Sequence, residues 1–298
     1  MSTPDRPAGS SRTTLAVFAG VVVASLGLAS VDARAAWVQL AQLLSLQGGP
    51  EPASANVLSE HHLEALDTMP PQAQAEFLLE RSINHYAGAH REIEARLPSW
   101  RGRIEPGDRF ESLFRMAINS DDLLVRAAAI EINLVARRLE KTSQTVDRLE
   151  PLARGGAQGP RANALWDLGL LGGRGVEPQR VASILLGSIH DDNVNIRYWA
   201  VEGLAYLATD ETIEPLLRIF HDDPSPMIRE RAACSLAQSG MLTRGQRMAA
   251  VPALIEFAGD TALDDQTRGW VYQALRDITG QTLPRDPVEW REWHRRQR

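Results

Sequence analysis

Apolar residues recur along this chain in blocks that each begin beside an arginine. The arginines stand at intervals of 35, 36, 32 and 39 residues and are Arg126, Arg161, Arg197, Arg229 and Arg268. Around each of them, the positions one before and three, four and seven after form one stripe of an α-helix and are mostly apolar. A unit of this length cannot bury its apolar face alone, so neighbouring units must stack. The pattern therefore predicts an all-α solenoid.

A first helix precedes the arginine helix in most units, which makes each unit a helical hairpin. From the spacing of leucine and isoleucine, we predict these first helices at 145–153, 179–189, 212–220 and 251–258. Paired aspartates stand just ahead of four arginine helices, at 121–122, 191–192, 222–223 and 264–265. Because a carboxylate accepts hydrogen bonds from the unpaired N–H groups of a first helical turn, we expect these aspartates to be N-caps.

Two of these units resemble HEAT repeats of the short kind found in bilin lyases. Their sequences are Asp-Asp-Asn-Val-Asn-Ile-Arg-Tyr-Trp-Ala-Val-Glu-Gly-Leu at 191–204 and Asp-Asp-Pro-Ser-Pro-Met-Ile-Arg-Glu-Arg-Ala-Ala-Cys-Ser-Leu at 222–236. The resemblance extends over residues 108–280. It implies a right-handed α-α superhelix, a HEAT-like solenoid of about five helical hairpins with helical caps.

The resemblance also implies a ladder of ion pairs between aspartates and arginines along the stack. The implied pairs are Asp192 with Arg197, Asp223 with Arg229, and Asp264 with Arg268. Arg126 and Arg161 occupy the same arginine column in the two remaining units. Residues 155–160 replace the aspartates ahead of Arg161 with Gly-Gly-Ala-Gln-Gly-Pro. At this point we therefore expect a gap in the ladder and an irregular stack.

Large polar and aromatic side chains occupy the positions two and five after the arginines, which lie off the buried stripe. The second helices of HEAT-like stacks line the concave side, and tryptophan and arginine are enriched where protein interfaces have energetic hot spots. This register gives a candidate protein-binding surface made of Trp166, Trp199, Glu202, Arg231, Trp270 and Gln273. The alternative is that each tryptophan packs against the next repeat, as large aromatic residues usually do.

Composition and motifs exclude several classes of partner and of chemical site. The net charge of the 298-residue chain is −6 with both signs interspersed, so we expect no nucleic-acid partner. Cys234 is the only cysteine, which excludes an internal disulfide and a multi-cysteine metal cluster. The sequence contains none of the common nucleophile, metalloprotease or phosphate-binding motifs. We therefore predict neither catalytic residues nor a cofactor nor a metal site.

The amino terminus has the pattern of an export signal or a membrane anchor. Residues 15–31 carry no charge and follow Arg6 and Arg12, and Ala33-Arg34-Ala35 fits a small-x-small cleavage site. We assign 1–36 to this signal peptide or anchor and leave cleavage open. If it is not cleaved, residues 15–31 hold the protein in a membrane, with the rest of the chain on the translocated side.

Helical caps are expected at both ends of the repeats, which we place at 108–280. A linker at 37–56 leads to an N-terminal helical cap at 57–107, in which one helix runs from Pro70-Pro71 to Pro98. That helix suits either a cap or a docking role, because its apolar spacing also fits a partner helix. Residues 281–298 form a C-terminal cap and tail, with Trp290 and Trp293 folded back onto the last repeat.

These observations favour a non-catalytic scaffold that binds another protein at the cell envelope, in the periplasm if the source is bacterial. One alternative is an enzyme or enzyme subunit resembling the phycobilin lyases, which share this repeat type. Another is a purely structural envelope component that associates with itself. The fold alone does not choose among them.

Overall fold

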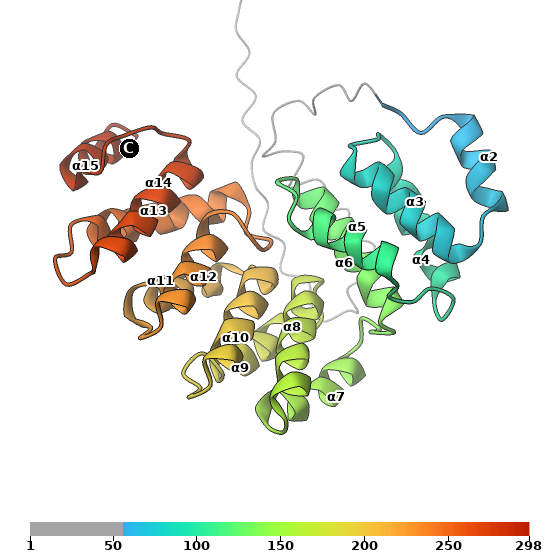
Figure 1. Cartoon of the computed structure of the whole chain (residues 1–298), viewed down its shortest axis with the longest axis horizontal. Coiled ribbons are helices and arrows are strands. Elements are labelled where there is room, and N and C mark those ends of the chain that lie inside the picture. Colours follow the sequence, from blue (N-terminus) through green and yellow to red (C-terminus); the bar gives the residue numbers. More distant parts are fainter. Residues whose placement is uncertain (1–55, 298) are drawn as a thin grey trace, which may run out of the picture.

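The computed structural model describes residues 56–297, and every regular element in this part of the chain is helical. Figure 1 shows a curved stack of antiparallel hairpins with α2 and α15 at opposite ends. Within each hairpin the two helices pack on each other, and α8, α10, α12 and α14 form one row. The hairpin helices are α5 (Asp108–Ile118), α6 (Leu123–Ala136), α7 (Ser143–Arg154), α8 (Gln158–Gly173), α9 (Pro178–Leu186), α10 (Val194–Leu207), α11 (Ile213–Asp222), α12 (Pro226–Ala237), α13 (Arg244–Ala258) and α14 (Asp265–Thr279). A short 3₁₀ helix, η1 (Asp210–Thr212), leads into α11. The predicted all-α solenoid is confirmed.

The region in front of the repeats is a further hairpin, and the single long helix predicted from Pro70 to Pro98 is wrong. Helix α3 (Pro71–Ile83) turns back into α4 (Ala89–Trp100), and the pair packs on α5 and α6. The chain reverses at His85 and Gly88, which have φ of 53° and 92°. A residue in the left-handed conformation ends an α-helix. The helical spacing of the apolar residues continues across this turn, so the sequence pattern does not indicate where the turn lies.

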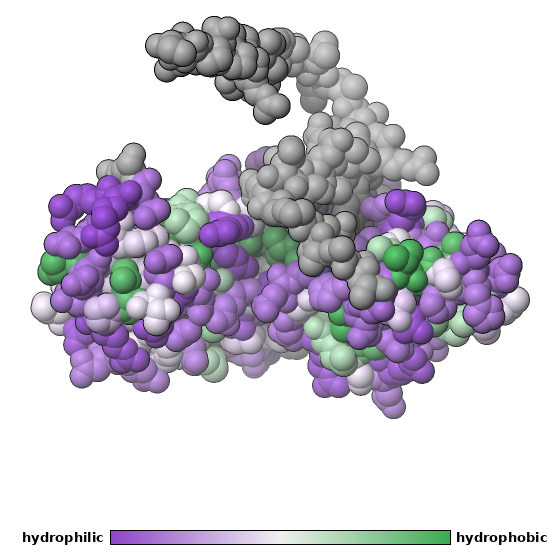
Figure 2. Space-filling model, turned by 90° about the horizontal axis from the view of Figure 1, so that it is seen from above, coloured by the Kyte–Doolittle hydropathy of each residue, from purple (hydrophilic) through white to green (hydrophobic). Residues whose placement is uncertain are grey.

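Two short helices cover the ends of the described stack. Helix α2 (Glu60–Thr68) precedes α3, and α15 (Pro287–Arg295) packs on α13. Trp290 and Trp293 of α15 are buried, and the Trp290 Nε1 donates to the Pro284 carbonyl at 3.0 Å. The face seen in Figure 2 is mainly hydrophilic where the described residues are visible, with apolar residues in separate patches.

The paired aspartates cap only two of the four helices for which we expected them to be N-caps. Asp122 accepts from the Leu124 N–H at the start of α6, and Asp264 accepts from the Thr267 N–H at the start of α14. Asn193 caps α10 instead, and Ser225 stands at the N-cap of α12 without a side-chain cap. Asp191 and Asp223 stand two residues before these N-caps, and their carboxylates are held by arginines of neighbouring repeats.

Helices α8 and α10 make the closest contact in the stack, because glycines face each other across it. A Cβ atom added at Gly169 would lie 2.5 Å from the Cα of Gly203. A Cβ at Gly203 would lie 2.8 Å from the Leu165 carbonyl oxygen. The small residues therefore let the two backbones touch.

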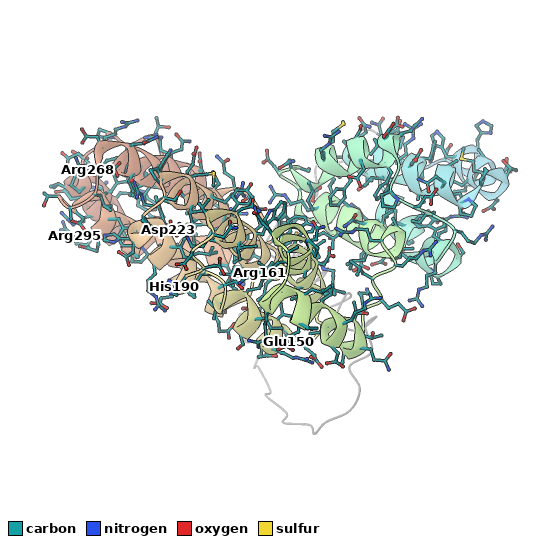
Figure 3. The ribbon with its side chains drawn as sticks, turned by 60° about the horizontal axis from the view of Figure 1, so that its bottom comes forward. Glu150, Arg161, His190, Asp223, Arg268 and Arg295 are labelled. Atoms are coloured by element: carbon teal, nitrogen blue, oxygen red, sulfur yellow. The ribbon has the colours of Figure 1, made fainter. Side chains whose placement is uncertain are left out.

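The stack bends between the hairpin α5–α6 and the later repeats, so the described chain forms two arms (Figure 3). Two contacts join the arms over long sequence distances. Arg126 Nη1 donates to the Gly240 carbonyl at 2.5 Å, and the Tyr206 hydroxyl donates to the Ile118 carbonyl at 3.4 Å. The loop after α12 thus reaches back to the first arm. This is a departure from a solenoid in which only adjacent units touch.

Candidate functional site

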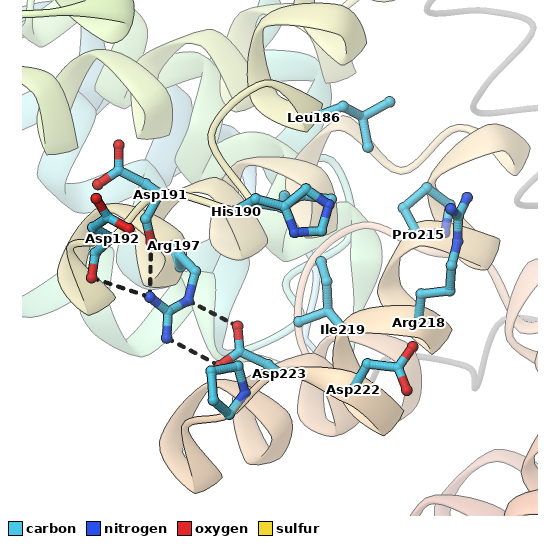
Figure 4. Close-up of a pocket in the computed structure, with 12 residues that line it drawn as sticks. Leu186, His190, Asp191, Asp192, Arg197, Pro215, Arg218, Ile219, Asp222 and Asp223 are labelled. Atoms are coloured by element: carbon cyan, nitrogen blue, oxygen red, sulfur yellow. Dashed lines mark hydrogen bonds and ion pairs between the residues drawn. The ribbon is translucent and has the colours of Figure 1, made fainter.

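A ladder of arginines and aspartates runs along the turns of the second arm, where Arg161, Asp223 and Arg268 follow one another (Figure 3). Arg161, Arg197 and Arg229 each link their own turn to the next repeat. Arg197 Nη1 donates to the Asp191 carbonyl at 2.8 Å, while its Nε donates to the Asp223 carboxylate at 2.8 Å (Figure 4). In the same way, Arg229 donates to the Asp223 carbonyl at 2.9 Å and to the Asp264 carboxylate at 2.8 Å.

The pairs implied by the resemblance are therefore shifted by one repeat. Each carboxylate accepts from the arginine of the preceding unit and not from the arginine of its own turn. Asp192 contributes only a backbone carbonyl, 3.4 Å from Arg197 Nη1. At the end of the row, Arg268 donates to the Leu263 carbonyl at 2.6 Å and pairs with the neighbouring Asp265.

The expected gap at Arg161 lies one unit earlier. Arg161 joins the ladder, because its Nε donates to the Ala153 carbonyl at 2.9 Å and its Nη1 lies 2.6 Å from the Asp191 carboxylate. Each carboxylate of the ladder accepts from the arginine of the preceding unit. The aspartate that residues 155–160 lack would therefore have accepted from the arginine of the unit before Arg161. Accordingly, the Arg126 guanidinium is buried and donates to two backbone carbonyls, of Ser120 and Gly240.

A groove of about 740 Å³ opens beside the ladder, between the turns that follow α9 and α11. Figure 4 shows His190 above it, with the Arg197–Asp223 pair on one side and Arg218 on the other. Of the aspartates that line this groove, Asp191 and Asp223 pair with arginines of the ladder, and Asp222 pairs with His221. These pairings do not bring a general acid and a general base together in the groove. We interpret the groove as the space between successive turns of the stack.

A second hollow, of about 540 Å³, lies where the two arms meet, and we call it the aromatic cleft. Helix α5 forms one wall, and α6, α8, α10 and α12 form the rest. Its lining includes Phe114, Arg115, Ile118, Asn133, Arg137, Asn163, Trp166, Tyr198, Trp199, Glu202, Tyr206 and Arg231.

Aromatic rings cluster at one side of the aromatic cleft. The Trp166 ring lies 4.6 Å from Tyr206 and 5.8 Å from Trp199, both edge to face. Tyr198 stands 5.5 Å from Trp199 in the same geometry. Trp166, Tyr198 and Trp199 are half-buried, so they pack against the neighbouring repeat and also face the cleft.

Four of the six residues in the predicted protein-binding surface meet here: Trp166, Trp199, Glu202 and Arg231. Trp270 and Gln273 lie on α14, outside the lining of the aromatic cleft. Gln273 is exposed and is hydrogen-bonded to Asp277 and Arg276 of its own helix. The wall from α5 was not predicted, because only the bend between the arms brings it to the cleft.

Buried carboxylates beside the aromatic cleft are paired with arginines of neighbouring units. Glu202 is buried, although we placed its column on the surface, and its Oε1 lies 2.5 Å from Arg231 Nε. Burial raises the pKa of Glu202 above its ordinary value. Asp167 on α8 lies 2.9 Å from Arg137 Nη1, and burial raises its pKa to about 6 despite this arginine.

The raised pKa of Asp167 predicts a specific pH dependence of stability. Since the folded protein binds this proton more tightly than the unfolded chain, the stability conferred by Asp167 is present at about pH 4 and is lost as the pH rises through about 6. Asp167→Asn removes the titration. Relative to the variant, the wild-type free energy of unfolding should fall by roughly 2 to 3 kcal/mol between about pH 4 and pH 7. Urea denaturation of both proteins across this range measures the difference, and a constant difference would contradict the assignment.

Residues 56–297 contain no group of three or more histidine, cysteine, aspartate or glutamate side chains placed to hold a metal ion. Burial raises the pKa of the Cys234 thiol, which disfavours the reactive thiolate. Within the same residues, no helix is both long and apolar enough to span a bilayer. The proposed anchor at 15–31 lies outside the described part of the chain.

Comparison with known proteins agrees with the repeat architecture. The family model of HEAT repeats matches residues 146–237 and again 181–276. No curated protein matches the sequence significantly. Among solved structures, the crystal structure of an engineered protein from a structural genomics consortium is similar at 15% identity and a TM-score of 0.36, covering 73% of this chain and 95% of that chain. Residues 146–276 are HEAT repeats, and the chain is therefore a HEAT-repeat protein.

Proposed function

We propose that this protein is a non-catalytic adaptor that binds a segment of another protein in the aromatic cleft. The observation that carries this proposal is the gathering of Trp166, Tyr198 and Trp199, all half-buried, beside Arg231 in one hollow. Tryptophan, tyrosine and arginine dominate the residues whose truncation weakens protein complexes most. HEAT repeats generally mediate protein–protein interaction and are typically non-catalytic, which supports the same assignment.

The shape of the aromatic cleft favours an inserted segment over a flat contact. Side chains from both arms surround it, with Phe114 and Ile118 opposite the aromatic cluster. A volume of about 540 Å³ is in the range of sites that enclose a few side chains of a ligand. A short extended or helical stretch of a partner can therefore bury its apolar side chains between the two walls.

We place this adaptor at the cell envelope, exported or tethered through residues 15–31. The support is the uncharged run itself and the arginines that precede it, Arg6 and Arg12. Fractionation of cells that express the full chain, compared with a form lacking 15–31, tests this location. Equal amounts of both forms in the cytosolic fraction would contradict it.

Random short peptides displayed on phage and selected against the full chain test the binding function. We expect Trp199→Ala to weaken the selected peptides at least about tenfold, because it removes the central ring of the cluster. Trp270→Ala is the matched control, since Trp270 is also half-buried but lies outside the aromatic cleft. Fluorescence anisotropy measures both affinities. Failure to select any peptide, or equal losses in the two variants, would contradict a binding role for the cleft.

A further inference from the structure

His221 stands near the end of α11 with a carboxylate against each nitrogen of its ring. Its Nδ1 lies 2.5 Å from the carboxylate of Asp222, the next residue. Its Nε2 lies 2.9 Å from the carboxylate of Asp260, which follows α13. A neutral imidazole has one N–H group, so it can donate to only one of these two carboxylates. Both contacts are complete only when the ring carries two protons.

The contact with Asp260 joins two neighbouring hairpins. His221 belongs to the hairpin α11–α12, and Asp260 belongs to the turn between α13 and α14. The His221 ring also lies 4.7 Å from the ring of Phe257 on α13, so it packs between the two first helices. Asp260 is held from its own turn, because its carboxylate accepts from the Ala262 N–H at 2.8 Å. His221 therefore reaches a positioned acceptor across the interface.

His190 shows that the local sequence alone does not create this contact. Like His221, it stands directly before a pair of aspartates at the end of a first helix. His190 is nevertheless exposed, and it forms no ion pair within the described part of the chain. The link at His221 therefore depends on the carboxylate that the following hairpin supplies.

The two carboxylates favour the doubly protonated ring. Partial burial of His221 disfavours the charge because it removes water from the ring, but Asp222 and Asp260 outweigh it and raise the pKa of His221 above its ordinary value of 6.5. The Ala262 N–H and the His221 ring together lower the pKa of Asp260. The carboxylate of Asp260 therefore stays ionised while His221 titrates.

Nearby charged side chains on the surrounding helices pair elsewhere. They are Arg218 of α11 with Glu214, Arg229 of α12 with Asp264, Glu256 of α13 with Arg291, and Arg268 of α14 with Asp265. Arg268 reaches Asp260 only at its backbone carbonyl, at 3.4 Å. Among residues 56–297, His221 is therefore the cation that pairs with the Asp260 carboxylate.

We propose that His221 is a pH-sensitive link that fastens the last hairpin to the rest of the stack. The imidazolium bridges Asp222 and Asp260, and release of one proton to water leaves a ring lone pair facing a carboxylate. Each unit of a solenoid is held mainly by its neighbours, so a weaker link here acts on the helices beyond it, α13 to α15.

The sign of the pH dependence follows from the raised pKa of His221 in the folded chain. The stability that the link confers is fully present below about pH 6.5 and is lost as the pH rises through the raised pKa. The last hairpin is therefore expected to open more readily at higher pH. Asp167 acts on the middle of the stack, so a measurement that resolves single helices separates the two titrations.

Hydrogen exchange of the full chain, followed by mass spectrometry, is the test. After correction for intrinsic exchange rates, His221→Gln should open α13 to α15 at least about threefold more than the wild type at about pH 5.5. At about pH 8 the two proteins should agree within about 1.5-fold, because the wild-type ring has lost its second proton. The ratio for α8 and α10 should stay near one at both pH values. His190→Gln is the matched control and should match the wild type throughout.

Nuclear magnetic resonance of the chain labelled with ¹⁵N-histidine reads the proton directly. The signals missing from His221→Gln identify His221. Both of its ring nitrogens should stay protonated in the folded chain at a pH at which the urea-unfolded chain has lost one proton. Asp260→Asn keeps an acceptor without the charge and should shift this titration to lower pH. A His221 that titrates as in the unfolded chain, or an exchange ratio for α13 to α15 that is equal at the two pH values, would overturn the inference.

Discussion

Replacing Gly169 with alanine is expected to lower the free energy of unfolding by about 3 kcal/mol or more, although it adds only one methyl group. The added Cβ would lie 2.5 Å from both the Cα and the carbonyl oxygen of Gly203. Those atoms belong to the backbone of α10 and cannot rotate away as a side chain can. The two helices must therefore separate, and overpacking that displaces a backbone costs more than the about 1 to 3 kcal/mol of an ordinary core insertion.

The matched control is the same substitution in the same helix. Gly159 stands in the first turn of α8, and a Cβ there would meet nothing within 4 Å. Gly159→Ala should change the free energy of unfolding by less than about 1 kcal/mol, because the backbone freedom that alanine saves in a helix is offset by the restriction that Pro160 places on the residue before it. Urea denaturation followed by far-ultraviolet circular dichroism measures both variants. If Gly169→Ala proves as mild as Gly159→Ala, α8 and α10 are not in backbone contact.

Local periodicity predicts the hairpins and the aromatic stripe but carries no information about the bend. The arginine blocks fall on α6, α8, α10, α12 and α14 because each block buries the same stripe of its helix. Trp166 and Trp199 could be placed together for the same reason, since they occupy the same face in successive repeats. By contrast, Arg126 and Gly240 are 114 residues apart and no pattern in either segment marks their contact.

The turn between α3 and α4 was missed for a different physical reason. Apolar residues keep their spacing of three and four from Ala75 to Leu97, so a single helix satisfies the pattern as well as a hairpin does. What ends α3 is the left-handed backbone at His85, which a non-glycine residue adopts only at a cost. His85 has a neighbour that helps to hold it, since its Nδ1 lies 3.3 Å from the Asp122 carboxylate of the next hairpin. That support comes from tertiary structure and leaves no mark on the local sequence.

For the ladder, the periodic sequence identifies the arginines and aspartates that take part, but it does not identify which arginine pairs with which aspartate. Asp223 stands six residues before Arg229 and 26 residues after Arg197, so it has one arginine in its own turn and another in the preceding repeat. Sequence spacing favours the near one. The structure pairs the carboxylate with Arg197, because a guanidinium can serve the carbonyls of its own turn with one nitrogen and a neighbouring carboxylate with the others.

Asp223→Ala is therefore expected to destabilise the protein through Arg197. The Arg197 and Asp223 side chains are 11% and 5% exposed, so the substitution leaves a largely buried guanidinium without its carboxylate. We expect a loss of about 3 kcal/mol, as for other buried pairs broken on one side. Asp192→Ala is the control one repeat back, because the Asp192 side chain is exposed and only its carbonyl contacts Arg197. Its effect should stay within about 0.5 kcal/mol.

Double-mutant cycles decide between the two registers of the ladder. If the pairs span repeats, Asp223→Ala and Arg197→Ala are strongly coupled, by about 1 to 3 kcal/mol, since either change alone breaks the same pair. Asp223→Ala and Arg229→Ala should be nearly additive, because Arg229 donates to the backbone carbonyl of Asp223, which alanine retains, and not to its carboxylate. The opposite result, coupling with Arg229 and additivity with Arg197, would restore the pairing within each turn. It would also remove the Arg197–Asp223 pair as a link between these two repeats.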